Sequence, residues 1–174
     1  RANLSTLSEL LESERVDDAK EFLSELNVRQ SERILLVNSH NAAIDAVLNQ
    51  KGYIGKKQGI DMRFRVNDLS ALRLPRVDVT IVLGNLIDNA MEASQGEEEP
   101  YIDLTIRQEK TFLVIKIINQ YSRDFSENLK TTKKKQKFHG IGIRSVKSIV
   151  TKYEGEFSID KKGTEVVVKI LIPN

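Results

Sequence analysis

Apolar residues recur at helical spacing in two segments near the start of the chain. The two sets are Leu4, Leu7, Leu10 and Leu11, and then Ala19, Phe22, Leu23 and Leu26. A turn over residues 14–17 would join two such helices into an antiparallel hairpin. A hairpin of this size has little core of its own, so its apolar stripes need a partner. We expect homodimerisation to bury them, and packing against the rest of the chain is the alternative.

From residue 38 onward, segments with apolar residues at helical spacing and segments in which apolar and polar residues alternate follow one another along the chain. Helical spacing predicts helices over about residues 42–52, 77–94 and 141–153. Alternation predicts strands over about residues 62–66, 102–107, 112–118, 156–160 and 164–172. Helices gathered on one face of a mixed or antiparallel sheet form a two-layer α+β sandwich. The predicted domains are therefore the hairpin, residues 1–37, and the sandwich, residues 38–174.

Composition narrows the classes of function. The 27 basic and 25 acidic residues nearly balance, which gives no reason to expect nucleic-acid binding or membrane-surface binding. The chain has no cysteine, so disulfides and thiolate metal sites are excluded. No apolar run approaches the length of a membrane span. Because residue 1 is Arg rather than Met, we expect further sequence upstream, where any membrane anchor would lie.

The helix predicted over residues 77–94 carries a polar stripe beside its apolar one. Its members recur at i, i+3, i+4 and i+7: Asn85, Asp88, Asn89 and Glu92. Asn is a poor helix former because its side chain competes for the backbone, so two of them one turn apart need a reason. Amide and carboxylate oxygens are hard ligands that suit Mg²⁺ carried by a nucleotide phosphate. A solvated helix face is the alternative, and the stripe alone does not decide between them.

A second motif precedes the last predicted helix. Gly140 and Gly142 flank Ile141 in the sequence KFHGIGIRSV. Glycines let a backbone approach an anion closely, and a helix N-terminus adds exposed N–H groups and a positive dipole end. The motif therefore suits a phosphate, although a tight turn that caps a helix is the alternative. It is neither a P-loop nor a Rossmann fingerprint, because no Gly-Lys-Ser/Thr follows and no strand leads directly into it.

In this order, the two motifs resemble those of the GHKL superfamily, which includes DNA gyrase, Hsp90, MutL and the histidine kinases. NLIDNAMEA resembles the N box of that superfamily, and HGIGIRSVKSIVTKYEGEF resembles its G2 box. Gly163 and Thr164, ahead of VVVKILIP, resemble its closing motif. The resemblance covers about residues 38–174. It is greatest to sensor histidine kinases of the Agr-like peptide quorum-sensing subfamily, through NSHNAAIDAVLNQKGYIGKKQGIDM. It implies the Bergerat ATP-binding fold, with ATP and Mg²⁺ as ligands.

The resemblance assigns roles to single residues. Asn89 would coordinate Mg²⁺, and Asn85 would contact phosphate. Gyrase-type members hold a water-activating Glu at the position of Asn85, so the Asn implies a kinase rather than a hydrolase. Asn119 falls where most members have an Asp that reads the adenine amino group, and Thr164 would lie near adenine. The rest of the usual Asp-x-Gly-x-Gly pattern is missing after Asn119, and Glu92 replaces a basic residue found in many kinases.

The phosphates would be held by the glycine motif and by a lid. The turn that provides backbone N–H groups comprises His139, Gly140, Ile141 and Gly142. Residues 121–138 have no clear period and would form a mobile lid over the nucleotide. Of the lysines in this stretch, Lys137 is nearest the turn and is the best candidate for a phosphate contact. A solvated loop is the alternative for each of these lysines, Lys137 included.

The resemblance also implies the reaction and the partners. The chain would be the cytoplasmic catalytic region of a membrane-anchored sensor histidine kinase, with a response regulator as its partner. Neither His40 nor His139 resembles a phosphoacceptor box, which reads His, acid, two residues, then Thr or Asn. If Asn3 is that Asn, the acceptor lies two positions before Arg1. A serine kinase of the anti-sigma-factor kind and a catalytically inactive interaction module are the alternatives.

Overall fold

The computed structural model describes residues 13, 15, 16, 18, 37–122 and 136–174. The chain separates into two compact units, Arg1–Ile34 and Leu35–Asn174. Most of the predicted hairpin, including Asn3, lies outside the described residues. Homodimerisation through these helices therefore stays a prediction.

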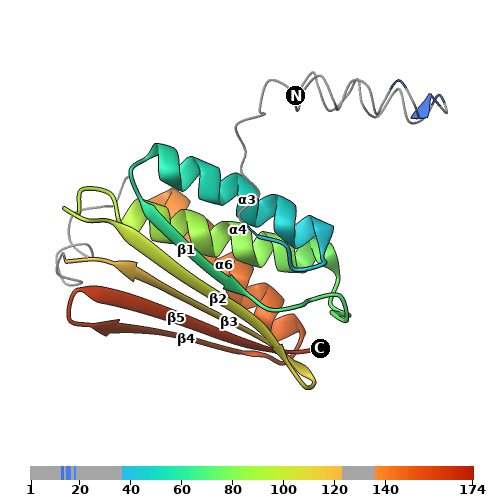
Figure 1. The fold of residues 1–174 in the computed structure, drawn as a ribbon. Coiled ribbons are helices and arrows are strands. Elements are labelled where there is room, and N and C mark those ends of the chain that lie inside the picture. Colours follow the sequence, from blue (N-terminus) through green and yellow to red (C-terminus); the bar gives the residue numbers. More distant parts are fainter. Residues whose placement is uncertain (1–12, 14, 17, 19–36, 123–135) are drawn as a thin grey trace. The chain divides into compact units, whose positions relative to one another are not determined.

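The second unit is a two-layer α+β sandwich. Its elements are α3 (Ala42–Lys57), β1 (Asp61–Val66), α4 (Arg76–Ala93), β2 (Tyr101–Glu109), β3 (Phe112–Gln120), α6 (Gln136–Lys152), β4 (Glu156–Lys162) and β5 (Glu165–Pro173). The strands form one sheet in the order β1-β2-β3-β5-β4. β1 pairs with β2 in parallel, and the remaining pairs are antiparallel. The three helices lie on one face of the sheet, with α4 between α3 and α6 (Figure 1). The predicted fold class and order of elements are confirmed.

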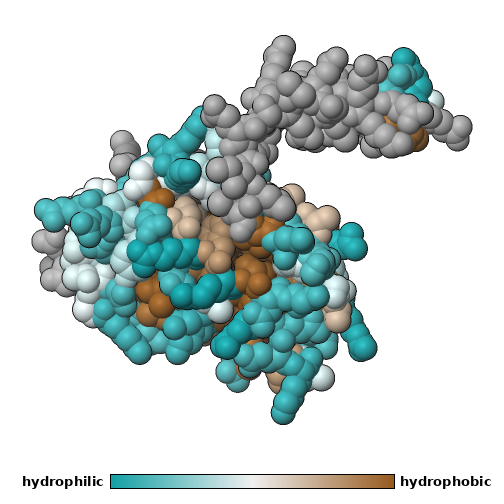
Figure 2. All heavy atoms as spheres, viewed as in Figure 1, coloured by the Kyte–Doolittle hydropathy of each residue, from teal (hydrophilic) through white to brown (hydrophobic). Residues whose placement is uncertain are grey.

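The core lies between this sheet face and the helices. Alternate residues of β2 and β3 are at most 1% exposed: Ile102, Leu104, Ile106, Leu113, Ile115 and Ile117. Val82, Leu83, Leu86 and Ile87 of α4 are at most 2% exposed. Each such aliphatic side chain contributes about 1.5–3 kcal/mol through its burial. In the view of Figure 2, hydrophilic residues cover most of the sandwich surface and hydrophobic ones show through in its middle.

Two helices extend further than the sequence predicts, and in both cases a glycine lies at a packing contact. α3 continues past the predicted end at residue 52 to Lys57. A Cβ on Gly55 would lie 2.4 Å from Met62 Sδ, so this glycine lets α3 approach β1 closely. α6 begins at Gln136 rather than near residue 141. The predicted turn at residues 139–142 is therefore wrong, because these residues are helical.

Two tight turns connect neighbouring strands, one at each end of the sheet. Glu109 pairs with Phe112, so Lys110 and Thr111 make the β2–β3 turn. Lys162 pairs with Glu165, which leaves Gly163 and Thr164 as a two-residue β4–β5 turn. Gly163 has a φ of 59°, the left-handed conformation that two-residue hairpin turns need and that glycine adopts without strain.

Candidate functional site

The two sequence motifs meet where α4 packs against α6. A Cβ on Gly142 would lie 3.1 Å from Asn85 Oδ1 and 3.4 Å from Asn89 Nδ2. Only glycine therefore leaves both amides at their present distance from the α6 backbone. The absence of a side chain at Gly142 supports helix–helix approach at the site. This is a different use of the glycine from the turn that the sequence predicts.

Asn89 carries an unsatisfied polar atom at this contact. Its Nδ2 is buried and has no hydrogen-bond partner among the described residues. Such an atom costs about 1–3 kcal/mol if nothing binds it. Because rotation of the amide exchanges its nitrogen and oxygen, the side chain can present either a donor or an acceptor at this point. An amide that the fold leaves unpaired is available to a ligand.

The residues of the polar stripe of α4 face two different helices, α6 and α3. Asn85 and Asn89 lie towards α6, whereas Asp88 is bound by Lys51 of α3. The Lys51 Nζ lies 2.6 Å from Asp88 Oδ1 and 2.7 Å from Asp88 Oδ2. The stripe is therefore not one uniform ligand set. Asp88 has a cationic partner already, and the two amides are the part that faces the glycine motif.

The end of β3 brings together the residues predicted to lie near adenine. Asn119 is 3% exposed, and its Nδ2 donates to the Gln120 carbonyl at 3.0 Å. The Ser94 hydroxyl, just after α4, donates to the same carbonyl at 3.3 Å. The Tyr121 N–H donates to the Thr164 carbonyl at 2.7 Å. Asn119 near the end of β3 and Thr164 in the turn before β5 thus lie close together, although Thr164 is exposed and Asn119 is buried.

Several predicted site residues cannot be placed in the same detail. Residues 123–135, most of the predicted lid with Lys133, Lys134 and Lys135, lie outside the described residues. Residues 136–138 of the predicted lid are helical and belong to α6. The side chains of Lys137, His139 and Ile141 also lie outside the described set, and Gly140 is placed only as part of α6. Their proposed phosphate contacts stay predictions.

The ligand chemistry of Asn89 fits a magnesium ion that is bound to a nucleotide. Mg²⁺ prefers oxygen ligands and usually takes most of them from water and phosphate, with few from the protein. The described residues include no group of three or more His, Cys, Asp or Glu that would hold a metal ion alone. A single amide such as Asn89 suits an ion that arrives with a nucleotide. The ion would be held there by the Asn89 carbonyl oxygen and by phosphate oxygens.

Sequence reasoning missed two participants near the site. Lys51 lies 37 positions before Asp88, and no sequence pattern links the two. Ser94 has a side chain that is fully buried, at 0% exposed, and ties the end of α4 to β3. Ser94 is the last residue of the helix predicted over residues 77–94, and no sequence pattern indicates its bond to a strand.

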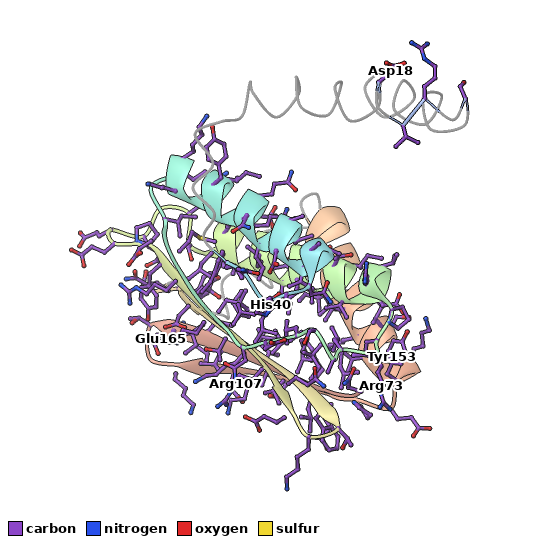
Figure 3. All side chains as sticks on the ribbon, turned by 45° about the vertical axis from the view of Figure 1, so that its right-hand side comes forward. Asp18, His40, Arg73, Arg107, Tyr153 and Glu165 are labelled. Carbon is purple, nitrogen blue, oxygen red and sulfur yellow. The ribbon has the colours of Figure 1, made fainter. Side chains whose placement is uncertain are left out.

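His40 lies ahead of α3, far from the glycine motif in sequence. The His40 side chain, labelled in Figure 3, has its Nδ1 3.1 Å from Asp68 Oδ2. Both side chains are more than half exposed. The neighbouring Ser39 is buried, and its hydroxyl donates to Asp45 at 2.6 Å. These bonds hold the start of the sandwich against α3. They give His40 a structural explanation that needs no phosphoacceptor role.

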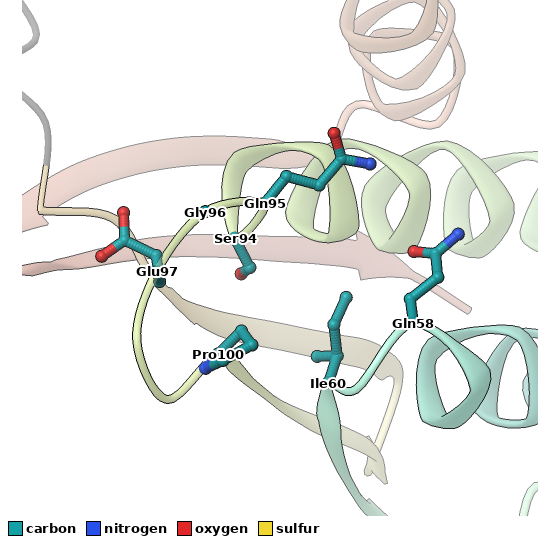
Figure 4. Close-up of a pocket in the computed structure, with 7 residues that line it drawn as sticks. All are labelled: Gln58, Ile60, Ser94, Gln95, Gly96, Glu97 and Pro100. Atoms are coloured by element: carbon teal, nitrogen blue, oxygen red, sulfur yellow. The ribbon is translucent and has the colours of Figure 1, made fainter.

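A separate pocket of about 370 Å³ opens at the C-terminal ends of α3 and α4 (Figure 4). Its lining residues are Gln58, Ile60, Ser94, Gln95, Gly96, Glu97 and Pro100. Neither Asn85 nor Asn89 lines it. The pocket is therefore not the place where the two motifs meet.

The family of the chain follows from residues 74–173, which match the GHKL domain family. This segment includes α4, the glycine motif and the closing turn. The chain belongs to the GHKL domain family. A comparison with curated proteins finds no match.

Solved histidine kinases share the fold. The catalytic domain of histidine kinase ThkA is 22% identical, with 78% of this chain and 93% of that chain covered, at a TM-score of 0.61. Histidine kinase AdeS from Acinetobacter baumannii is 16% identical over 99% of this chain and 95% of that chain, at a TM-score of 0.56. The mycobacterial sensor histidine kinase MprB is 16% identical over 77% and 95%, also at 0.56. At these identities, the likeness concerns the fold.

Within the described part of the chain, the helices all fall short of the length and apolarity that a bilayer crossing requires.

Proposed function

We propose that the sandwich binds Mg-ATP between α4 and α6 and is the catalytic domain of a histidine kinase. The observation that carries the proposal is the Asn89 Nδ2 atom, which is buried, has no hydrogen-bond partner among the described residues and lies against Gly142. The membership of the GHKL domain family and the histidine-kinase folds support it. Asn89 would hold Mg²⁺, Asn85 would contact phosphate, and Asn119 with Thr164 would position adenine.

The proposed chemistry is transfer of the γ-phosphoryl group to a histidine imidazole outside this chain, and then to an aspartate of a response regulator. Phosphoryl transfer depends mainly on positioning and charge neutralisation, and a kinase needs no base that activates water. An amide at position 85 suits this requirement because it binds phosphate without activating water. The homodimer, the membrane anchor and the Agr-like character of the whole protein belong to the same proposal and rest on sequence resemblance.

The first experiment is a calorimetric titration of Mg-ATP into the wild-type chain and into Asn89→Ala. We expect binding to the wild-type chain and loss of the Mg²⁺-dependent part in the variant, with an unchanged fold by circular dichroism. Asn67→Ala, the same substitution at an exposed asparagine, is the control and should bind normally. If the wild-type chain does not bind Mg-ATP at millimolar concentration, the proposal is refuted. If Asn89→Ala binds Mg-ATP normally, the assignment of Asn89 to the metal is wrong.

The second experiment extends the chain upstream and follows phosphate from labelled ATP. An acid-labile, base-stable phosphate is expected, as histidine phosphorylation gives. Phosphate on Ser or Thr would favour a kinase of the anti-sigma-factor kind. Nucleotide binding with no phosphorylation in the extended chain would favour an inactive interaction module.

A further inference from the structure

Acidic residues neighbour, along α4, the two amides that would meet the phosphates. Asp88 directly precedes Asn89 and lies three positions after Asn85, and Glu92 lies three positions after Asn89. Helical residues three or four apart are neighbours, with Cβ atoms roughly 5–6 Å apart. A triphosphate bound by the two amides would therefore lie near Asp88. An uncompensated carboxylate at that distance repels a polyanion.

Lys51 supplies the compensation from a different helix. Its Nζ contacts both carboxylate oxygens of Asp88, at 2.6 Å and 2.7 Å. The Lys51 side chain is 19% exposed, whereas the Asp88 side chain is 51% exposed. The ammonium group thus reaches Asp88 from the α3 side and leaves the other side of the carboxylate open. This places a positive charge at Asp88, which neighbours the candidate phosphate ligands along α4.

We propose that Lys51 is a specificity-determining residue that lets the acidic α4 face accept a nucleotide triphosphate. It acts by neutralising Asp88, and its effect grows with the number of phosphate charges on the ligand. The inference rests on the proposed function, because it presumes that Asn85 and Asn89 bind phosphate. It predicts that Lys51 matters more for ATP than for ADP and not at all for adenosine.

A second lysine–aspartate pair on the same helix provides a matched control. Lys152 of α6 contacts Asp78 in the first turn of α4, with Nζ 2.7 Å from Oδ2. Asp78 and Asp88 are ten residues apart, which is roughly 15 Å along a helix at 1.5 Å per residue. Loss of the Lys152 pair removes an interhelical ion pair of the same kind, away from the candidate ligands. If Lys51 had only a structural role, replacing Lys51 and replacing Lys152 would have the same effect on Mg-ATP binding.

The test measures dissociation constants for Mg-ATP, Mg-ADP and adenosine by calorimetry at low salt. Lys51→Met should weaken Mg-ATP binding by about three- to tenfold and Mg-ADP binding by less, with adenosine unchanged. The loss should shrink at high ionic strength, because the Debye length falls to about 3 Å at 1 M salt. Lys51→Arg, which keeps the charge, should stay within about twofold of wild type, as should Lys152→Met.

Two variants separate charge neutralisation from other roles. Lys51→Met combined with Asp88→Asn should recover Mg-ATP affinity to within about twofold, because no charge remains to be neutralised. Asp88→Asn alone keeps Lys51 and the shape of the side chain, so it tests the inference even if Lys51→Met fails to fold. It should bind Mg-ATP at least as tightly as wild type.

Three results would overturn the inference: a weaker Asp88→Asn, no recovery in the double variant, or equal losses for ATP and adenosine. If the wild-type chain fails to bind Mg-ATP, the proposed function falls together with the inference. If wild type binds and Lys51→Met binds equally well, the inference alone is wrong.

Discussion

Gly142 of α6 lies against Asn85 of α4, so that a Cβ on the glycine would be only 3.1 Å from Asn85 Oδ1. The glycine motif and the asparagine stripe, which are distant in sequence, are thus parts of one helix–helix contact. The contact holds the Asn85 and Asn89 amides at the α6 backbone. This relationship ties the identity of residue 142 to the position of both candidate ligands.

Gly142→Ala should therefore weaken nucleotide binding more than it weakens the fold. The new methyl group forces Asn85 to shift by a few tenths of an ångström, and Asn89 lies only 3.4 Å away. Alanine favours helix by up to about 1 kcal/mol over glycine, which offsets part of the steric cost to stability. We expect about a tenfold rise in the dissociation constant of Mg-ATP, because misplaced ligands lose binding steeply. Calorimetry and urea unfolding measure the two effects.

Gly84→Ala on α4 is the matched control. A Cβ there would meet nothing within 4 Å, so the substitution changes helix propensity alone. We expect a gain in unfolding free energy of about 0.5–1 kcal/mol and unchanged Mg-ATP binding. Reduced binding by this variant would show that α4 responds to any substitution, and the Gly142 interpretation would then lose its support.

The sandwich was predictable because its patterns are local. The alternation of Ile102, Leu104 and Ile106 gives the strand, and burial of those residues selects one register. The boundaries that failed depend on glycines whose neighbours come from elsewhere in the chain. A sequence cannot show that Gly55 packs on Met62 or that Gly142 packs on Asn85. The first predicted helix therefore stops at residue 52, before Gly55, and Gly142 is assigned to a turn.

The sequence allowed residues of the candidate site to be singled out by their type, but not by their contacts. Asn85, Asn89 and Gly142 could be singled out because amides in a helix and paired glycines are costly unless something requires them. The resemblance to a family implies that they bind one nucleotide, but their mutual contact was not predicted. The Lys51–Asp88 ion pair could not be predicted, because one surface lysine among many carries no signal of the aspartate it contacts.

Gly155→Ala should destabilise the sandwich strongly without involving the site. A Cβ at this position would lie 2.5 Å from the Leu171 carbonyl oxygen and 3.1 Å from Val150 Cγ1. A backbone oxygen in a sheet cannot move aside as a flexible side chain can. We expect a loss of about 1–3 kcal/mol in unfolding free energy, measured by urea denaturation. A loss below roughly 0.5 kcal/mol, which is the scatter of surface substitutions, would contradict the tight contact.

Tyr101 should make the fold sensitive to alkali. Desolvation and its hydrogen bond to Glu165 raise the pKa of Tyr101 to about 12 in the folded chain, against about 10 for an ordinary tyrosine. The unfolded chain therefore loses this proton first, and stability falls as pH rises from about 10 to about 12. Tyr101→Phe has no such proton, so its unfolding midpoint in urea should fall less over this range. Parallel pH profiles of wild type and variant would refute the assignment.

Asp78 should make the stability of the fold sensitive to acid. Hydrogen bonds from Lys152 and Tyr153 hold the pKa of the Asp78 carboxyl below its usual value in the folded chain. The contribution of Asp78 to the free energy of unfolding is thus complete above the pKa of about 3.9 that it has in the unfolded chain. It disappears as the pH falls through the lower pKa that Asp78 has in the folded chain. Asp78→Asn, which cannot titrate, should be less stable than wild type at pH 7.

The difference in urea midpoint between wild type and Asp78→Asn should be constant at neutral pH. It should shrink below about pH 4 and vanish in stronger acid, where both folded and unfolded carboxyls are protonated. Tyr153→Phe keeps the Lys152 ion pair and should show a smaller effect of the same sign. A difference that stays constant down to strong acid would mean that the variant loses packing rather than charge. In that case the link between α4 and α6 at this end would depend on the shape of Asp78 and not on its ionisation.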